Sequence, residues 1–254
     1  MQRQAKLTAA ENDNFECQAD HNTSNQNPVI RQDLLPMCTY NEAVKELGLT
    51  PTTCEELGIG FLNYGRSPLR GRIIMQVRDA RLKKDNTERR QVVLSHIGLQ
   101  DQSNDTIWFY PSFNTKRELL GQERLRLDET TRNQVSKHNS IILTDDPLGL
   151  AKAYQYGVRN MISTLSTAPS EEQVVQAVSL AHENKVHSVK FLLKRAKKNA
   201  CYDFTRDGVH FTIFDWEQSF KLKNSNRVSI PKNISILSHF SEDQLLWLQK
   251  MALI

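Results

Sequence analysis

The stretch that most constrains the fold is residues 140–157, SIILTDDPLGLAKAYQYG, in which an apolar run leads into an acidic turn and a helix. The apolar run predicts a buried strand over 140–143. In the turn, Asp146 suits the residue that caps a helix, and Pro147 suits the first helical position. A strand that carries acidic groups to the start of a helix is typical of α/β folds, which place their sites at the carboxyl edge of a sheet.

The same alternation of apolar runs and helical patterns continues toward the C-terminus. It predicts, in order, helix 147–156, strand 160–165, helix 171–184, strand 187–193, strands 209–214 and 228–230, and a last amphipathic helix from Ser241. Ser170 and Gln173 match a capping box at the start of helix 171–184. Because strands that alternate with helices pair in parallel, we expect a mostly parallel sheet in this half.

The chain before residue 136 has a different pattern. Its predicted elements are helices 39–47, 51–57 and 116–127 and strands 59–64, 71–77, 91–97 and 106–110. The polar run 83–86 indicates the turn of an antiparallel hairpin between two of these strands. Thr50, Pro51 and Gly58 suit the cap, the first residue and the end of helix 51–57. The predicted fold class is therefore α/β, with an α+β N-terminal subdomain (34–135) followed by an α/β subdomain (136–254).

Residues 1–33 are polar and lack apolar periodicity, so we expect a disordered tail there. No apolar stretch reaches the length of a signal segment or a membrane span, which indicates a cytoplasmic protein with no membrane partner. The 4 cysteines include no Cys-x-x-Cys pair, which disfavours a zinc finger or a disulfide framework. The net charge of +4 permits a polyanionic partner without requiring one.

Two basic clusters indicate where a polyanion could bind. The first, residues 66–90, surrounds the predicted hairpin and includes Arg70, Arg72 and Arg78. The second accompanies the end of strand 187–193 and consists of Lys190, Lys194, Arg195, Lys197 and Lys198. Several cations on one surface neutralise the phosphates of a nucleic acid. The alternatives are a solvated hairpin with a Lys-rich turn for the first cluster and a plain charged helix face for the second.

The acidic turn offers a different chemistry. Asp145 and Asp146 could hold Mg²⁺, which prefers oxygen ligands and usually takes only one or two carboxylates from protein. Asp215 and Glu217, which follow strand 209–214, could complete such a site. The alternatives are that Asp146 only caps the helix and that the second acidic pair belongs to a surface turn.

Three segments carry a family resemblance. They are LGLTPTTCEELGIGFLNYG (47–65), GRIIMQVRD (71–79) and YPSFNTKRELLGQERL (110–125). Their order and spacing resemble the catalytic core of bacterial DnaG-type primases, in which a Toprim domain follows. The stretch 140–157 then stands where the first strand, acidic turn and helix of that domain belong. The resemblance covers residues 40–245 and implies a primase-core fold with DNA as partner.

The chain departs from this family at the residues that bind metal. The resemblance places the Toprim glutamate at Asp145, the glycine after it at Asp146 and a later acid at Gly149. The Asp-x-Asp pair of the family falls near Lys194-Arg195-Ala196, a basic segment. The resemblance therefore implies a degenerate site without a cofactor, in which Asp145 is a remnant metal ligand. A polar tail stands in place of the zinc-binding module of the family.

The preferred hypothesis is a primase- and Toprim-related DNA-binding protein, catalytically degenerate, with an accessory role in DNA replication or in the maintenance of a mobile element. Arg72 matches an arginine of the family, and Lys116 lies one residue out of register with its lysine. The predicted contacts to DNA, expected to be single-stranded, are Arg70, Arg72, Arg78, Lys116, Lys190, Lys194, Arg195, Lys197 and Lys198. Two alternatives stay open: an active primase or Toprim nuclease with a rearranged Mg²⁺ site, and an interaction module that docks a helicase or another replication or defence partner.

Overall fold

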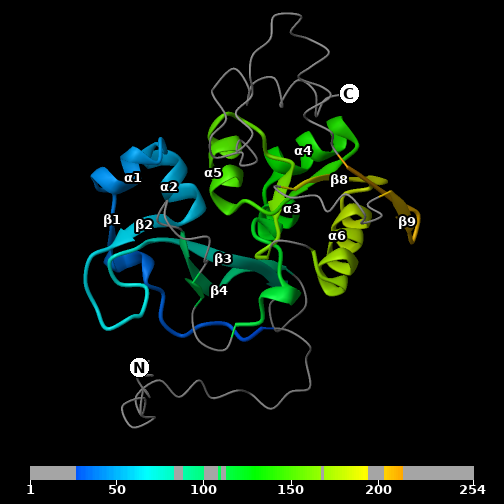
Figure 1. The fold of residues 1–254 in the computed structure, drawn as a ribbon. Coiled ribbons are helices and arrows are strands. Elements are labelled where there is room, and N and C mark those ends of the chain that lie inside the picture. The colour runs from blue at the N-terminus through cyan, green and yellow to red at the C-terminus, as the bar shows by residue number, and fades with distance from the viewer. Residues whose placement is uncertain are drawn as a thin grey trace, which may run out of the picture.

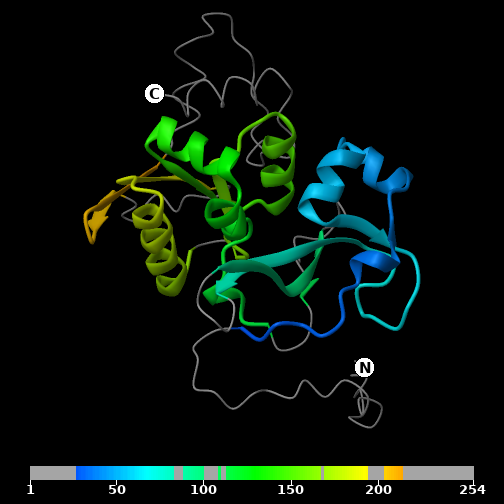
Figure 2. The ribbon, with the colours of Figure 1, turned by 180° about the vertical axis from the view of Figure 1, so that it is seen from behind.

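The computed structural model describes residues 27–82, 88–99, 108–109, 113–166, 169–193 and 203–213. Within these residues the chain forms two sheets of five strands each, one antiparallel and one mostly parallel. Figure 1 shows the antiparallel sheet in the lower part of the view and the second sheet with its helices above it, and Figure 2 shows the reverse side. The predicted α/β class, antiparallel part first, is confirmed.

The antiparallel sheet has the strand order β1-β2-β3-β4-β5. Its strands are β1 (Cys38–Thr39), β2 (Ile59–Leu62), β3 (Ile73–Leu82), β4 (Arg89–Leu99) and β5 (Trp108–Phe109). The predicted hairpin is confirmed as the β3–β4 pair, and it contains a β-bulge between Val77 and Arg78. The predicted turn of this hairpin lies outside the described residues.

Three short helices precede the long strands: η1 (Leu35–Met37), α1 (Glu42–Glu46) and α2 (Pro51–Leu57). The prediction for α2 is confirmed, because Thr50 Oγ1 accepts a hydrogen bond from Thr53 N at 3.3 Å and Gly58 ends the helix with φ 65°. The helix expected to start at residue 39 starts only at Glu42. The reason is that residues 38 and 39 pair with β2, so that the side chain of Asn41 supplies the cap.

The predicted helix 116–127 is interrupted in the structure. The segment forms η2 (Thr115–Arg117) and α3 (Gln122–Leu127) with an extended stretch between them. Leu120 in this stretch makes an isolated antiparallel bridge with Ser163. Gly121, with φ 86°, then turns the chain into α3, a conformation that only glycine adopts at little cost.

A further helix, α4 (Glu129–His138), was not predicted from the sequence. It has a good cap, since the side chain of Asp128 accepts a hydrogen bond from Thr130 N at 3.0 Å. Only Thr131 and Val135 are buried along it, so the apolar periodicity that normally identifies a helix is weak. The predicted subdomain boundary between residues 135 and 136 falls inside this helix.

The second sheet has the strand order β7-β6-β8-β10-β9. Its strands are β6 (Ile141–Thr144), β7 (Met161–Ser163), β8 (Ser188–Leu192), β9 (Phe204–Arg206) and β10 (Val209–Ile213). The β6–β7, β6–β8 and β8–β10 pairs are parallel, as the alternation of strands and helices predicts. The short strand β9 was not predicted and runs antiparallel to β10. The predicted strand 228–230 and the last helix lie outside the described residues.

Two helices, α5 (Pro147–Gln155) and α6 (Glu171–Glu183), cover opposite faces of the second sheet. The predicted cap of α5 is confirmed, because Gly149 N donates to Asp146 Oδ1 at 2.9 Å. The predicted capping box of α6 is also confirmed: Gln173 N donates to Ser170 Oγ at 3.1 Å, and Ser170 N donates to Gln173 Oε1 at 3.0 Å.

The two sheets share an apolar core. Met75, Val77 and Ile97 of the antiparallel sheet belong to the same buried cluster as Ile142 on β6 and Leu150 on α5. A second cluster fills the other face of the parallel sheet, under α6. None of the helices in the described part of the chain is both long enough and apolar enough to cross a membrane.

Structure begins earlier than Leu34, where the sequence placed it. Ile30 N donates to Val93 O at 3.0 Å, which extends the pairing along an open stretch of β4. Asn27 is buried, with only 3% of its surface exposed. These residues are ordered through hydrogen bonds rather than through apolar burial, and apolar periodicity therefore gives no sign of them.

Candidate nucleic-acid interface

The connections of the parallel sheet define where a ligand site would lie. From β6 the chain passes through α5 to β7 on one side, whereas from β8 it continues to β9 and β10 on the other side. The neighbouring carboxyl ends of β6 and β8 thus form the point at which the winding of the sheet reverses. Open α/β sheets bind their ligands in the crevice at such a point. At this edge Thr144 of β6 pairs with Leu192 of β8.

The acidic turn follows β6 directly at this edge. Asp146 is buried and caps α5, and Asp145 beside it is half-buried. No group of three His, Cys, Asp or Glu side chains that could hold a metal ion occurs in the described ranges. Asp215 and Glu217 lie outside those ranges. A role for Asp145 as a remnant metal ligand therefore stays a prediction.

The second basic cluster begins on β8 and continues past its end. Lys190 is half-buried on the strand, opposite Ile142 and Thr212, and burial lowers the pKa of its ammonium group. Burial, Lys137 and Lys190 also lower the pKa of His138 at the end of α4. The charge of Lys190 thus acts on His138, which lies at the amino edge of the sheet, the edge opposite the acidic turn. Lys194, Arg195, Lys197 and Lys198 lie outside the described residues.

The structure divides the first basic cluster into three parts. Arg66 and Arg70 are exposed in the connection between β2 and β3, and Arg72 at its end is half-buried. Arg78 lies inside the protein, and Arg81 and Arg89 pair with acidic side chains. Because a strand rises about 3.3 Å per residue, Arg72 and Arg81 stand about 30 Å apart along β3. The cations that the sequence grouped together therefore do not form one surface.

Arg78, a predicted DNA contact, is 9% exposed. Its Nε donates to Gln76 Oε1 at 2.7 Å, and its Nη1 donates to the carbonyl oxygen of Glu56 at 2.7 Å. Burial lowers the pKa of its guanidinium group, while the charges of Glu123 and Asp33 oppose this shift. Arg78 holds α2 to β3 and is not part of the interface proposed below.

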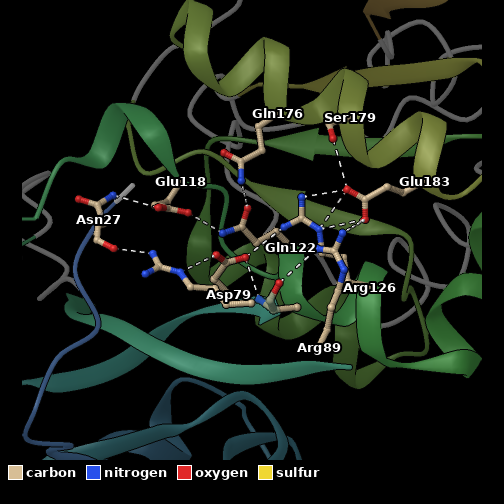
Figure 3. Close-up of polar contacts among 11 residues, drawn as sticks. Asn27, Asp79, Arg89, Glu118, Gln122, Arg126, Gln176, Ser179 and Glu183 are labelled. Atoms are coloured by element: carbon tan, nitrogen blue, oxygen red, sulfur yellow. Dashed lines mark hydrogen bonds and ion pairs between the residues drawn. The ribbon is translucent and has the colours of Figure 1, made fainter. Parts of the chain in front are cut away.

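Arg81 and Arg89 belong to a network of charged side chains that joins three elements. Figure 3 labels Asp79, Arg89, Arg126 and Glu183 of this network. Asp79 on β3 accepts from Arg81 Nε at 3.2 Å and from Arg126 Nη1 of α3 at 3.1 Å. Arg126 Nε also donates to Glu183 of α6 at 3.1 Å, and Arg89 lies 3.5 Å from the same carboxylate. The network joins the hairpin to α3 and α6, so these arginines have partners within the protein.

The motif KRELLG (116–121) is divided between surface and interior. Glu118 is buried: it accepts from Asn27 Nδ2 at 3.1 Å and from Gln122 Nε2 at 2.6 Å (Figure 3). Burial raises the pKa of this carboxyl group, while both hydrogen bonds oppose the rise. Lys116 is exposed on η2, and its carbonyl oxygen accepts a hydrogen bond from Ser170 Oγ at the start of α6. Of this motif, Lys116 is thus a surface cation and Glu118 anchors the N-terminal segment.

No protein-family model matches the sequence, and no curated protein matches it. Similar solved structures include a DNA primase domain from Pseudomonas aeruginosa, 21% identical with TM-score 0.43, covering 59% of this chain and 53% of that one. The E. coli primase catalytic core is 16% identical with TM-score 0.42, covering 66% and 56%. The DnaG primase catalytic domain bound to ssDNA is 17% identical with TM-score 0.41, covering 58% and 53%. The chain thus spans a little over half the length of these structures. They are bacterial primases, the family whose motifs the sequence resembles.

Proposed function

We propose that the chain is a primase-related DNA-binding protein whose α/β half has exchanged metal chemistry for phosphate binding. One observation carries this proposal: β8, whose carboxyl end lies beside that of β6, is followed in the sequence by cations where the family resemblance expects acids. Leu192, the last residue of β8, pairs with Thr144, the residue before Asp145. Two positions after Leu192 the run Lys194, Arg195, Lys197 and Lys198 begins.

The charges that accompany this edge in the sequence suit a phosphate better than a magnesium ion. Asp146 is occupied as the cap of α5, which leaves Asp145 as the acid of the turn that could bind a metal. Mg²⁺ is held by carboxylates and repelled by neighbouring cations, whereas a phosphate backbone is held by Lys and Arg. DNA is therefore the ligand that this balance of charge favours. We expect an accessory role in replication or mobile-element maintenance, alongside a helicase or another replication protein.

Binding of DNA by the full chain provides the test. We expect an oligonucleotide to bind at low salt, with an affinity that falls steeply as salt is raised and is unchanged by EDTA. The double variant Lys194→Glu, Arg195→Glu is expected to weaken binding about tenfold or more, since it reverses two charges at the phosphate. Arg132→Glu, a charge reversal on the exposed face of α4, is the matched control and should bind as the parent does. Absence of binding at low salt, or binding that requires Mg²⁺, would contradict the proposal.

The position of Asp145 favours a second candidate, an active primase or Toprim nuclease. Asp145 directly follows β6 at the edge where such a fold would bind its metal. Primer synthesis and strand cleavage, assayed in the same samples with divalent metals, separate the two candidates. Activity that Asp145→Asn abolishes would establish the enzyme and overturn the degenerate site.

A further inference from the structure

The connection between β2 and β3, residues 63–72, is a fixed loop with a defined shape. At its base Leu62 N donates to Arg72 O at 2.9 Å, and Gly71 N donates to Leu62 O at 2.8 Å. Leu69 is fully buried and packs in a small cluster with Leu62 and Ile74. The loop is thus held by hydrogen bonds at its base and by an apolar anchor in its middle.

The outer surface of this loop exposes one aromatic side chain and two cations. Tyr64 has 55% of its surface exposed, and Arg66 and Arg70 are exposed as well. Within the described part of the chain, no carboxylate pairs with the guanidinium groups of these two arginines. The sequence from residue 58 to residue 78 contains no Asp or Glu at all. In Figure 1 the loop projects at the left edge of the molecule, in cyan.

We propose that residues 63–72 form a single-strand contact, in which Tyr64 stacks on an unpaired base while Arg66 and Arg70 bind nearby phosphates of the same strand. The inference rests on the proposed DNA-binding function and adds to it the means of distinguishing single strands from duplexes. Proteins that bind single strands combine a basic surface with aromatic side chains, because every base has a face on which a ring can stack. In a duplex these faces are covered by neighbouring bases.

The arrangement of the loop fits this role in two respects. The loop exposes a ring and two cations together, and a nucleotide can bind both, since its base is flat and apolar on its faces and its phosphate is anionic. Because the loop is already held in shape, little conformational entropy is lost when a strand binds.

The test compares three ligands of equal length: a fluorescein-labelled oligothymidylate, the same backbone made of abasic sites, and a blunt duplex. Tyr64→Ala is expected to weaken binding of the oligothymidylate about tenfold, the size of one lost stacking contact, and to leave the abasic strand and the duplex unchanged. Tyr64→Phe keeps the ring and should bind as the parent does. Val175→Ala, at an exposed apolar residue on α6, is the control for loss of exposed apolar surface.

The arginines are tested by salt dependence. Arg66→Ala and Arg70→Ala should each reduce the slope of log affinity against log salt by about 0.7, the value for one phosphate of a single strand. Equal binding of the oligothymidylate by the parent and by Tyr64→Ala would overturn the loop contact while leaving DNA binding intact. A parent protein that binds none of the three ligands would overturn the proposed function and the loop contact together. Unchanged circular dichroism of each variant confirms that the fold is retained.

Discussion

Gly58 ends α2 with φ 65°, and a β-carbon added there would collide with the side chains of Gln76 and Arg78. Gly58→Ala therefore meets two costs, a strained backbone and displacement of a buried arginine. We expect the free energy of unfolding in urea to fall by about 2–4 kcal/mol. Gly71→Ala is the matched control, because Gly71 also has positive φ, 76°, but has nothing within 4 Å of an added β-carbon. Its expected loss is about 1 kcal/mol, and equal losses for both variants would contradict the role of Gly58 in accommodating Arg78.

His96 lies fully buried on β4, with its Nε2 2.8 Å from Asp33 Oδ1. Burial lowers the pKa of His96, although Asp33 opposes this shift. Burial alone would raise the pKa of Asp33, but hydrogen bonds from Leu35 N, His96 and Gln76 together lower it. The pair joins the N-terminal segment to the antiparallel sheet.

These shifts predict how stability depends on pH. In the unfolded chain a histidine takes up a proton near its ordinary pKa, about 6.5, whereas folded His96 remains neutral to lower pH. The folded state is therefore favoured fully above that pH and less as pH falls below it. Urea unfolding between about pH 8 and pH 5.5 should show this loss, and His96→Gln should make the dependence shallower. His187→Gln, at an exposed histidine, is the control, and an unchanged slope in His96→Gln would refute the assignment.

At the scale of elements, Arg126 is the residue that joins the hairpin to the helices. Its guanidinium contacts Asp79 of β3 and Glu183 of α6, and its own side chain is only 9% exposed. Arg126→Met leaves Asp79 buried and without this partner, so we expect thermal or urea unfolding to show a loss of about 2 kcal/mol. Lys45→Met, which removes the exposed pair with Glu42, should change stability by about 0.5 kcal/mol or less. A similar small effect for both variants would mean that the network in Figure 3 does not stabilise the junction.

The elements also show which local signals are sufficient to predict helices and strands from the sequence. The ends of α2, α5 and α6 agree with the sequence because caps depend on residues within one turn of the helix. The helix α4 and the strand β9 were missed because little of either faces the core: α4 buries two side chains, and β9 is a three-residue edge strand with no fully buried residue. Gln134 on α4 exchanges hydrogen bonds with Gly157 and Arg159, and β9 is held by its pairing with β10. Neither kind of contact produces apolar periodicity in the sequence.

At the scale of the whole molecule, the two sheets are held as one body by apolar and polar contacts together. The shared apolar cluster runs from Met75 on β3 to Leu150 on α5. At the other end of the hairpin, the network of Asp79, Arg126 and Glu183 makes the corresponding polar junction. The loop of residues 63–72 and the carboxyl edge of the parallel sheet belong to different sheets. A single DNA strand that contacts both regions would therefore bind more weakly after charge reversal in either of them.

The sequence by itself determined the order of most elements, the parallel pairing after residue 140 and the role of Asp146 as a cap, because each depends on local periodicity or on neighbours within a few residues. Tertiary structure decided what the basic residues do. Arg78 is buried, Arg81 and Arg89 are paired, and Arg66 and Arg70 face the solvent. The physical reason is that a cation becomes available to an outside ligand only if folding leaves it exposed and brings no carboxylate to it. That outcome depends on residues such as Glu183, which folding alone brings to the hairpin.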